Sequence, residues 1–201
     1  MLKNKHLLCD VDECILQWTN GFTKFLHQHH NIIPSRIRDD HSVYKWLEIH
    51  PEEAHNLVTE FNSSHQFAAL EPFDGAQKIL PKLYNEGYTI VAITCCSSDS
   101  IIAAMRRENL HKYFGNIFQD IICLDFYDDK KAVLSRYKNA FWIEDNMEWA
   151  VAGADLGHKT FLINHKHNES LNDSRIIRVD DWHIIYSMIY EYNFPLLTAN
   201  V

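Results

Sequence analysis

Two aspartates, Asp10 and Asp12, stand one residue apart directly after the apolar run 7–9. In an extended segment, residues two apart point to the same face, so both carboxylates are aimed at one small volume. Such a pair is tolerated in a buried setting when a divalent cation or a shared proton offsets the repulsion. We therefore interpret this stretch as a buried strand that delivers two carboxylates to a metal ion and a phosphate. A solvated turn or a helix N-cap would also accommodate the pattern.

Further reactive side chains stand where an apolar run ends or a helix is expected to begin; they are Thr94, the pair Lys130 and Lys131, and the pair Glu144 and Asp145. In an open α/β sheet, ligands collect at the carboxyl ends of the strands, so these groups can meet in one crevice. A carboxylate nucleophile, an acid/base carboxylate, a hydroxyl, an amine and a further carboxylate together suit metal-assisted phosphoryl transfer. Each group also has an ordinary structural explanation, but their order along the chain favours chemistry.

The elements that must position these groups alternate along the chain. We expect strands at 7–9, 88–94, 117–124, 140–143 and 160–163, and helices at 75–87, 100–110, 131–137, 147–156 and 181–192. The β-branched run 88–94 is typical of a parallel strand that is covered on both faces. The alternation predicts an α/β fold, with a doubly wound, Rossmann-like parallel sheet in which 160–163 is the last clear strand.

Residues 15–71 interrupt this alternation with helical, aromatic-rich sequence. Trp18, Phe22 and Phe25 recur at the spacing of one helix face, and Pro51 followed by two glutamates is typical of a helix start. No strand is expected in this part. We therefore predict two units, an α/β core formed by 1–14 and 72–201, and a small helical cap inserted as 15–71 after the first strand.

The composition limits the possible functions. A chain of 201 residues that is 46% hydrophobic can bury one sizeable core. A net charge of -8 argues against binding to polymeric nucleic acid, although a few local cations suffice to hold one phosphate on a small substrate. No apolar run approaches transmembrane length and the chain starts without a signal peptide, so we expect a cytoplasmic protein with no membrane contact. The oligomeric state is open, a homodimer included.

Cysteine and histidine usage gives no sign of a disulfide framework or a zinc site. The five cysteines lie in or beside apolar runs, which suits reduced, buried thiols. The thirteen histidines include clusters at 27–30 and 165–167, but neither cluster is joined by cysteine or by a spacing typical of zinc ligands. We expect both clusters on the surface.

Four segments together resemble the motifs of the haloacid dehalogenase superfamily of phosphatases; they are Asp10-Val11-Asp12, Thr94 after its apolar strand, the lysine that opens a helix, and Ile143-Glu144-Asp145-Asn146. Within that superfamily the chain is most similar to the 5′(3′)-deoxyribonucleotidases, on looser segments such as 67–72 and 142–153. The resemblance implies a Mg²⁺-dependent phosphomonoesterase that acts on (deoxy)nucleoside monophosphates. The alternatives are a phosphatase of another small metabolite, such as a sugar phosphate, and a non-catalytic module that binds phosphorylated ligands.

The resemblance also implies a role for each catalytic side chain. Asp10 would attack phosphorus and form an aspartyl-phosphate, with one of its oxygens on Mg²⁺. Asp12 would protonate the leaving oxygen and later activate water, while its backbone carbonyl binds the metal. Thr94 would donate its hydroxyl to the transferring phosphoryl group. Lys130 would pair with Asp10 and the phosphate, with Lys131 as the rival candidate.

The remaining assignments concern the metal and the substrate. Asp145 would be a metal ligand, with Glu144 as a second acidic group, directly or through water. Trp18 falls where the deoxyribonucleotidases place an aromatic residue facing the base, and Phe67 lies at another matching position. Phe22 could add to an aromatic lid over the substrate.

Several positions depart from the family pattern, among them Asp128, which stands two residues before Lys130 where the family often has a basic residue. Glu13 and Cys14 stand where the family has Gly and then Thr or Val, so we expect a turn after the first strand that tolerates a side chain. Cys95 follows Thr94 where the deoxyribonucleotidases have Ser, which leaves the backbone N–H to contact phosphate.

Overall fold

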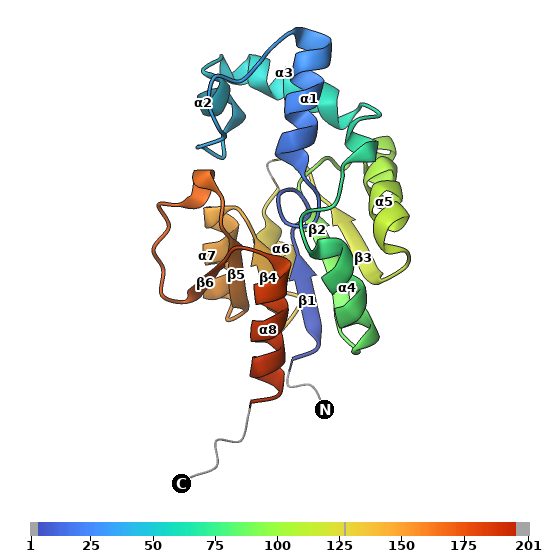
Figure 1. Cartoon of the computed structure of the whole chain (residues 1–201), viewed down its shortest axis with the longest axis vertical. Helices are drawn as coiled ribbons and strands as arrows, with labels where there is room; N and C mark the ends of the chain where they lie inside the picture. The colour runs from blue at the N-terminus through green and yellow to red at the C-terminus, as the bar shows by residue number, and fades with distance from the viewer. Residues whose placement is uncertain (1–3, 127, 196–201) are drawn as a thin grey trace.

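The computed structural model describes residues 4–126 and 128–195, which form one six-stranded parallel sheet between helices (Figure 1). The strands are β1 (His6–Cys9), β2 (Thr89–Thr94), β3 (Phe118–Cys123), β4 (Phe141–Glu144), β5 (Lys159–Ile163) and β6 (Ile176–Val179). Their order across the sheet is β3-β2-β1-β4-β5-β6, so the chain runs outward from β1 in one direction and then returns to its other side. This confirms the predicted doubly wound sheet.

The helices are α1 (Trp18–His30), α2 (Val43–Leu47), α3 (Pro51–Asn62), α4 (Ala76–Asn85), α5 (Ser100–Phe114), α6 (Lys130–Leu134), α7 (Met147–Asp155) and α8 (Trp182–Asn193). Helices α4, α5 and α8 cover one face of the sheet, and α6 and α7 cover the other. Within β1, Leu7 packs into the cluster that holds Ile185 of α8, whereas Leu8 packs with Val133 of α6. This is the alternation that a strand buried on both faces must show.

Polar caps fix the helices that follow the strands. The side chains of Asp99, Asp129, Asn146 and Asp181 accept hydrogen bonds from backbone N–H groups in the first turns of α5, α6, α7 and α8. Each cap satisfies N–H groups that have no partner inside the helix. The loops between the strand ends and these helices are therefore held in defined positions.

A sixth strand follows the one expected to be the last. Ile176–Val179 pairs with β5 at the edge of the sheet, in register from Thr160 to Ile163. It has only four residues, and Arg178 in its middle donates to the backbone carbonyl of Asn168 at 2.9 Å. So short a run, interrupted by a charge, carries too little periodicity to be predicted.

Helices α1, α2 and α3 lie beyond the carboxyl ends of the strands (Figure 1). Their aromatic side chains interlock, with ring centroids 4.6 Å apart for Trp18 and Phe22 and 5.3 Å apart for Phe22 and Phe61. The same apolar cluster continues into the sheet, so this layer is packed firmly against the strand ends. The division into a core of 1–14 and 72–201 and a cap of 15–71 stays a prediction. Within 4–126 and 128–195, no helix is long and apolar enough to cross a membrane.

Candidate functional site

A cavity of about 410 Å³ lies between the carboxyl ends of the strands and the helices above them. Its floor carries acidic groups and one ammonium group, from Asp10, Asp12, Lys130, Glu144 and Asp145. Its upper wall is mostly apolar and includes Trp18, Val43, Tyr44, Ala54 and Val58, with Arg38 as a cation. The structure thus brings the charged residues predicted from three separate segments into one small space.

Lys130 joins two carboxylates at the floor of the cavity. Its Nζ lies 2.6 Å from Oδ1 of Asp10 and 2.9 Å from Oε2 of Glu144, and all three side chains are buried. Burial alone would lower the pKa of this ammonium group, but the two carboxylates outweigh burial and raise the pKa well above its usual value. Lys131 is exposed, and its backbone N–H donates to Asp129. Of the two rival lysines, Lys130 contacts Asp10.

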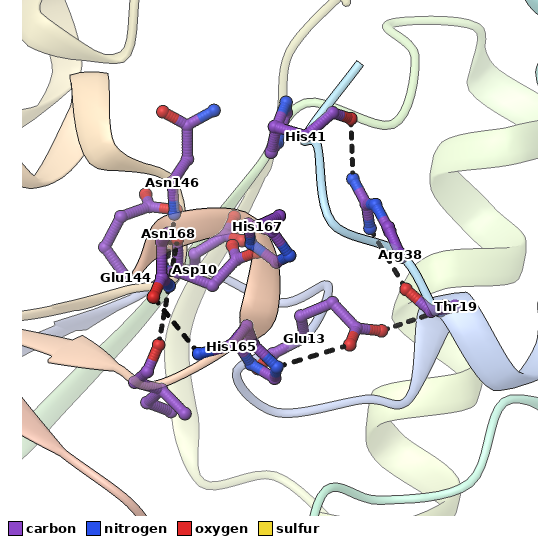
Figure 2. A network of polar contacts seen from close by, with 12 residues as sticks. Asp10, Glu13, Thr19, Arg38, His41, Glu144, Asn146, His165, His167 and Asn168 are labelled. Carbon is purple, nitrogen blue, oxygen red and sulfur yellow. Dashed lines mark hydrogen bonds and ion pairs between the residues drawn. The ribbon is translucent and has the colours of Figure 1, made fainter. Parts of the chain in front are cut away.

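Glu144 ends β4 and Asp145 follows it, and both carboxylates are held by short contacts; Figure 2 shows Glu144 beside Asn146. Oε1 of Glu144 accepts from the backbone N–H groups of Asp145 and Asn146 at 3.1 and 3.0 Å. Oδ2 of Asp145 lies 2.8 Å from Nε2 of His167. Burial raises the pKa of both carboxyl groups, to about 8 for Asp145, where the negative charge of Asp10 adds to the effect. The site is therefore short of positive charge.

Three buried residues in the described part of the chain could hold a metal ion together. Ligand atoms of Asp10, Cys14 and Asp145 lie within 4.8 Å of one another. Burial and the nearby charge of Asp145 raise the pKa of the Cys14 thiol, so the two carboxylates are the better donors. Carboxylate oxygens are the donors that Mg²⁺ prefers, and a divalent cation would offset the excess negative charge. The residues present fit such an ion.

Asp12 contacts a cation that the sequence analysis did not single out. Nη2 of Arg106 on α5 lies 2.6 Å from Oδ1 of Asp12, and the arginine side chain is fully buried. Burial raises the pKa of Asp12 to about 7, although Arg106 acts in the opposite direction. A signal was available, because Arg106 shares one helix face with the buried Ile102 and Leu110. A charged residue on an apolar helix face indicates a buried partner, because a buried charge without one is strongly unfavourable.

The turn after β1 keeps the geometry that a glycine would adopt. Glu13 has φ 61°, in the left-handed region that is unfavourable for a residue with a side chain by roughly 1 kcal/mol. The turn does hold a side chain, as expected, but in a left-handed conformation that glycine would adopt with less strain. Contacts on both sides compensate: Oε1 of Glu13 accepts from the Thr19 backbone N–H at 2.6 Å, and the Glu13 carbonyl oxygen lies 2.9 Å from Nε2 of His165.

A polar network links this turn to the upper wall of the cavity (Figure 2). Arg38 donates from Nη1 to Oγ1 of Thr19 at 3.0 Å and from Nη2 to the His41 carbonyl at 2.9 Å. His167 is buried and His165 is half-buried, so the prediction that the 165–167 cluster lies on the surface is wrong. Burial lowers the pKa of His167 to about 4 and keeps the ring neutral. A loop sequence carries no periodicity that would have indicated this burial.

The other predicted residues are distributed between the cavity and the core. Trp18 lines the cavity and donates from Nε1 to Asn62 at 3.2 Å, and Cys95 also lines it. Phe22 and Phe67 are fully buried in the core and do not line the cavity. Thr94 is buried at the end of β2, and its Oγ1 has no hydrogen-bond partner within the described residues.

No family model matches the chain, and a search of curated proteins found no match. Several solved structures do resemble it. A protein from Clostridium acetobutylicum described as a predicted phosphatase gives a TM-score of 0.69 at 14% identity, over 95% of this chain and 100% of that one. The Bacillus subtilis HAD-hydrolase YfnB, bound to magnesium, gives 0.62 at 15% identity, over 92% and 98%. This chain has the fold of haloacid dehalogenase-like hydrolases.

A third neighbour, with the same fold, was solved with an organic ligand. A mutant of CbbY from Rhodobacter sphaeroides, in complex with xylulose-(1,5)bisphosphate, gives a TM-score of 0.60 at 14% identity, over 90% of this chain and 95% of that one. At such identities the likeness concerns the arrangement of strands and helices. The chemistry of this chain is indicated by the charged cavity at the carboxyl end of its sheet.

Proposed function

We propose that this protein is a Mg²⁺-dependent phosphomonoesterase that uses Asp10 as its nucleophile. The observation that carries the proposal is the buried cluster at the carboxyl end of the sheet, in which Lys130 contacts Asp10 at 2.6 Å and Asp145 stands close enough to share a metal ion. Phosphoryl transfer through a covalent intermediate requires such groups: a nucleophilic carboxylate, a nearby ammonium group and a carboxylate that binds a metal ion.

In the first step, an oxygen of Asp10 forms a bond to phosphorus while the bond from phosphorus to the leaving oxygen breaks. Asp12 gives its proton to that oxygen, so the alcohol leaves neutral. In the second step, Asp12 takes a proton from water, the water oxygen bonds to phosphorus, and the aspartyl-phosphate bond breaks. Lys130 holds Asp10 in place and offsets negative charge, and Thr94 offers its hydroxyl to a phosphate oxygen. Mg²⁺ held by Asp10 and Asp145 would neutralise charge on the phosphate.

For the substrate, we propose (deoxy)nucleoside monophosphates. The cavity of about 410 Å³ has room for one small molecule, and the Trp18 indole on its wall offers a flat apolar surface on which a base can stack. Roles for Phe22 and Phe67 would be indirect, since both rings lie in the core. Lys131 is exposed and does not line the cavity, so the geometry gives it no contact with a substrate there.

A sugar phosphate is the second candidate. Arg38 places a cation on the upper wall, opposite the acidic floor, where it could pair with a second anionic group. The complex of the CbbY mutant with a sugar bisphosphate shows that a protein of this fold can hold such a ligand.

Phosphate release from a panel of monoesters tests both candidates. The panel contains deoxy- and ribonucleoside 5′- and 3′-monophosphates beside sugar phosphates, each measured with Mg²⁺ and with a chelator. We expect release that requires Mg²⁺ and is fastest for one substrate class. An Asp10→Asn preparation, purified in parallel, controls for contaminating phosphatases. A folded protein that binds nucleotide but releases phosphate from no monoester would refute the enzyme hypothesis.

A further inference from the structure

Arg106 is the buried cation of this site whose presence the packing does not explain. It lies on α5 and reaches Asp12 across a sequence separation of 94 residues, with no exposed surface of its own. Its guanidinium also stacks on Phe67, with Cζ 4.0 Å from the ring centroid. The neighbouring Arg107 is exposed and donates to the Ile121 carbonyl at 3.3 Å, as an ordinary surface arginine does.

The buried position of Arg106 is unfavourable by itself. Nε and Nη1 are buried and have no hydrogen-bond partner among the residues that the structure describes, so Asp12 is the single carboxylate that compensates for the desolvated charge. Replacing such an ion pair by apolar side chains of similar size is often neutral or stabilising. Stability is therefore a poor reason for an arginine here, and its effect on Asp12 is a better one.

The contact constrains how Asp12 can act. Arg106 engages Oδ1 at 2.6 Å, which leaves Oδ2 as the oxygen that can exchange a proton, while Asp12 itself lines the cavity. The Phe67 ring packs against the guanidinium, and the arginine side chain is fully buried, so its position beside Asp12 is defined by packing. Proton transfer depends on the acid being held within a fraction of an ångström of the atom it protonates.

We infer that Arg106 is the positioning residue that orients Asp12 for proton transfer to the leaving oxygen. This inference rests on the proposed phosphomonoesterase function. It assigns one cation to each carboxylate of the Asp-x-Asp pair: Lys130 fixes the nucleophile Asp10, and Arg106 fixes the acid Asp12. Phe67 then contributes as the surface on which the guanidinium is stacked, rather than by touching substrate.

The leaving group provides a readout that a purely structural role would not affect. An alkyl phosphate needs its leaving oxygen protonated, whereas 4-nitrophenolate leaves without a proton. We would compare kcat/KM, which reports the step that expels the leaving group, for the best alkyl phosphate of the panel and for 4-nitrophenyl phosphate. In Arg106→Met, kcat/KM should fall about 100-fold for the alkyl phosphate, the scale of general acid catalysis, and less than about 5-fold for the aryl phosphate.

Two further variants make the comparison decisive. Arg106→Lys keeps a positive charge with a single contact, so it should lose less than Arg106→Met and show the same selectivity for the alkyl phosphate. Arg107→Met should leave both rates unchanged. Equal losses for the two substrates, or no loss for the alkyl phosphate, would overturn the inference. If Arg106→Met does not fold, as judged by its thermal transition, Arg106→Lys decides alone by the same criterion. A folded wild-type protein that is inactive on both esters would instead refute the proposed function itself.

Discussion

The two ends of the parallel sheet bury polar groups in opposite ways. At the amino end, Asn193 exchanges hydrogen bonds with the backbone of Asn4 at 3.1 and 3.3 Å and donates to the Tyr88 hydroxyl at 2.6 Å. These groups are neutral and satisfy one another. At the carboxyl end, the buried groups are charged, and Lys130 has to serve both Asp10 and Glu144.

The difference separates groups kept for stability from groups kept for chemistry. Neutral hydrogen bonds that satisfy each other are favourable or nearly neutral when buried. Buried carboxylates are unfavourable unless they are paired, and here the pKa of Asp12 rises to about 7 and that of Asp145 to about 8, chiefly because of burial. The buried carboxyl groups at the carboxyl end can therefore bind a cation, and a carboxyl group with a pKa near 7 can also give and take a proton. We therefore expect mutations at the carboxyl end to change catalysis as well as stability, and mutations at the amino end to change stability alone.

The largest expected effect is on turnover at the carboxyl end. Asp10→Asn should lower phosphatase activity by more than about 10⁴-fold, because an amide cannot form the covalent phosphoryl intermediate. The fold should be retained, since the amide is almost isosteric and Lys130 keeps Glu144 as a partner. Steady-state phosphate release and far-UV circular dichroism measure the two properties. Asp120→Asn, a change at an exposed position of β3, is the matched control. Retained activity would refute the nucleophile role of Asp10.

The next effect concerns the stability of the same end. Lys130→Met leaves Asp10 and Glu144 buried without their shared cation, which should lower the free energy of unfolding by about 3–5 kcal/mol. Lys131→Met changes a neighbouring exposed side chain and should alter it by less than about 0.5 kcal/mol. Urea unfolding without Mg²⁺ at neutral pH measures both. Equal stabilities of the two variants would show that the two contacts of Lys130 do not hold the carboxyl end together.

The sequence predicted well those parts of this end that depend on local pattern. Asp10, Thr94 and Asp145 each stand at or directly after an apolar strand, and the topology of a doubly wound sheet then brings strand ends together. The sequence could not distinguish Lys130 from Lys131, because two adjacent lysines at a helix start differ only in the direction in which each side chain points, and that direction depends on how the helix packs. In the structure, the Asp129 side chain caps the helix at the Lys131 N–H, and Lys130 is the lysine that contacts Asp10.

Contacts between segments that are distant in the sequence could not be predicted from local patterns. Arg106 meets Asp12 only because α5 packs against the loop after β1, and spacing within α5 gives its buried face without naming its partner. His167 is buried because its loop folds back over Asp145, an arrangement that no periodic pattern reports. The edge strand β6 is a related case, since four residues that contain an arginine look like loop until their neighbour β5 is known.

At the amino end, a smaller effect should appear in stability alone. Asn193→Ala removes the side chain that joins Asn4 to Tyr88 and leaves buried backbone groups without partners, so the free energy of unfolding should fall by about 1–3 kcal/mol. Phosphatase activity per folded molecule should not change. Asn172→Ala, at an exposed loop position, controls for loss of an asparagine. A change in kcat of the Asn193 variant would mean that the two ends are coupled.

The smallest effect is a slope of stability with pH, and it comes from His158 at the amino end. The ring is buried, with Nδ1 accepting from the Ala140 N–H at 3.2 Å and Nε2 lying 3.1 Å from the Leu134 carbonyl. Only the neutral tautomer with its proton on Nε2 satisfies both neighbours. Burial lowers the pKa of His158 below its usual value, so just below pH 6.5 this ring is protonated less in the folded protein than in the unfolded chain.

The contribution of His158 to stability should therefore fall as the pH is lowered from 6.5, because this ring takes up its proton preferentially in the unfolded chain. The buried carboxyl groups of Asp12 and Asp145, whose pKa values are raised, act in the opposite direction and do so equally in the wild type and in a His158 variant. One such proton contributes a slope of at most about 1.4 kcal/mol per pH unit. His158→Gln can supply a similar acceptor and donor without titrating, so the free energy of unfolding of the wild type should fall relative to that of His158→Gln as the pH is lowered from 6.5 to 5. His27→Gln, at an exposed position, should keep the wild-type slope. If the difference in free energy of unfolding between the wild type and His158→Gln is the same at pH 5 and at pH 6.5, the His158 ring does not titrate differently in the folded and unfolded states.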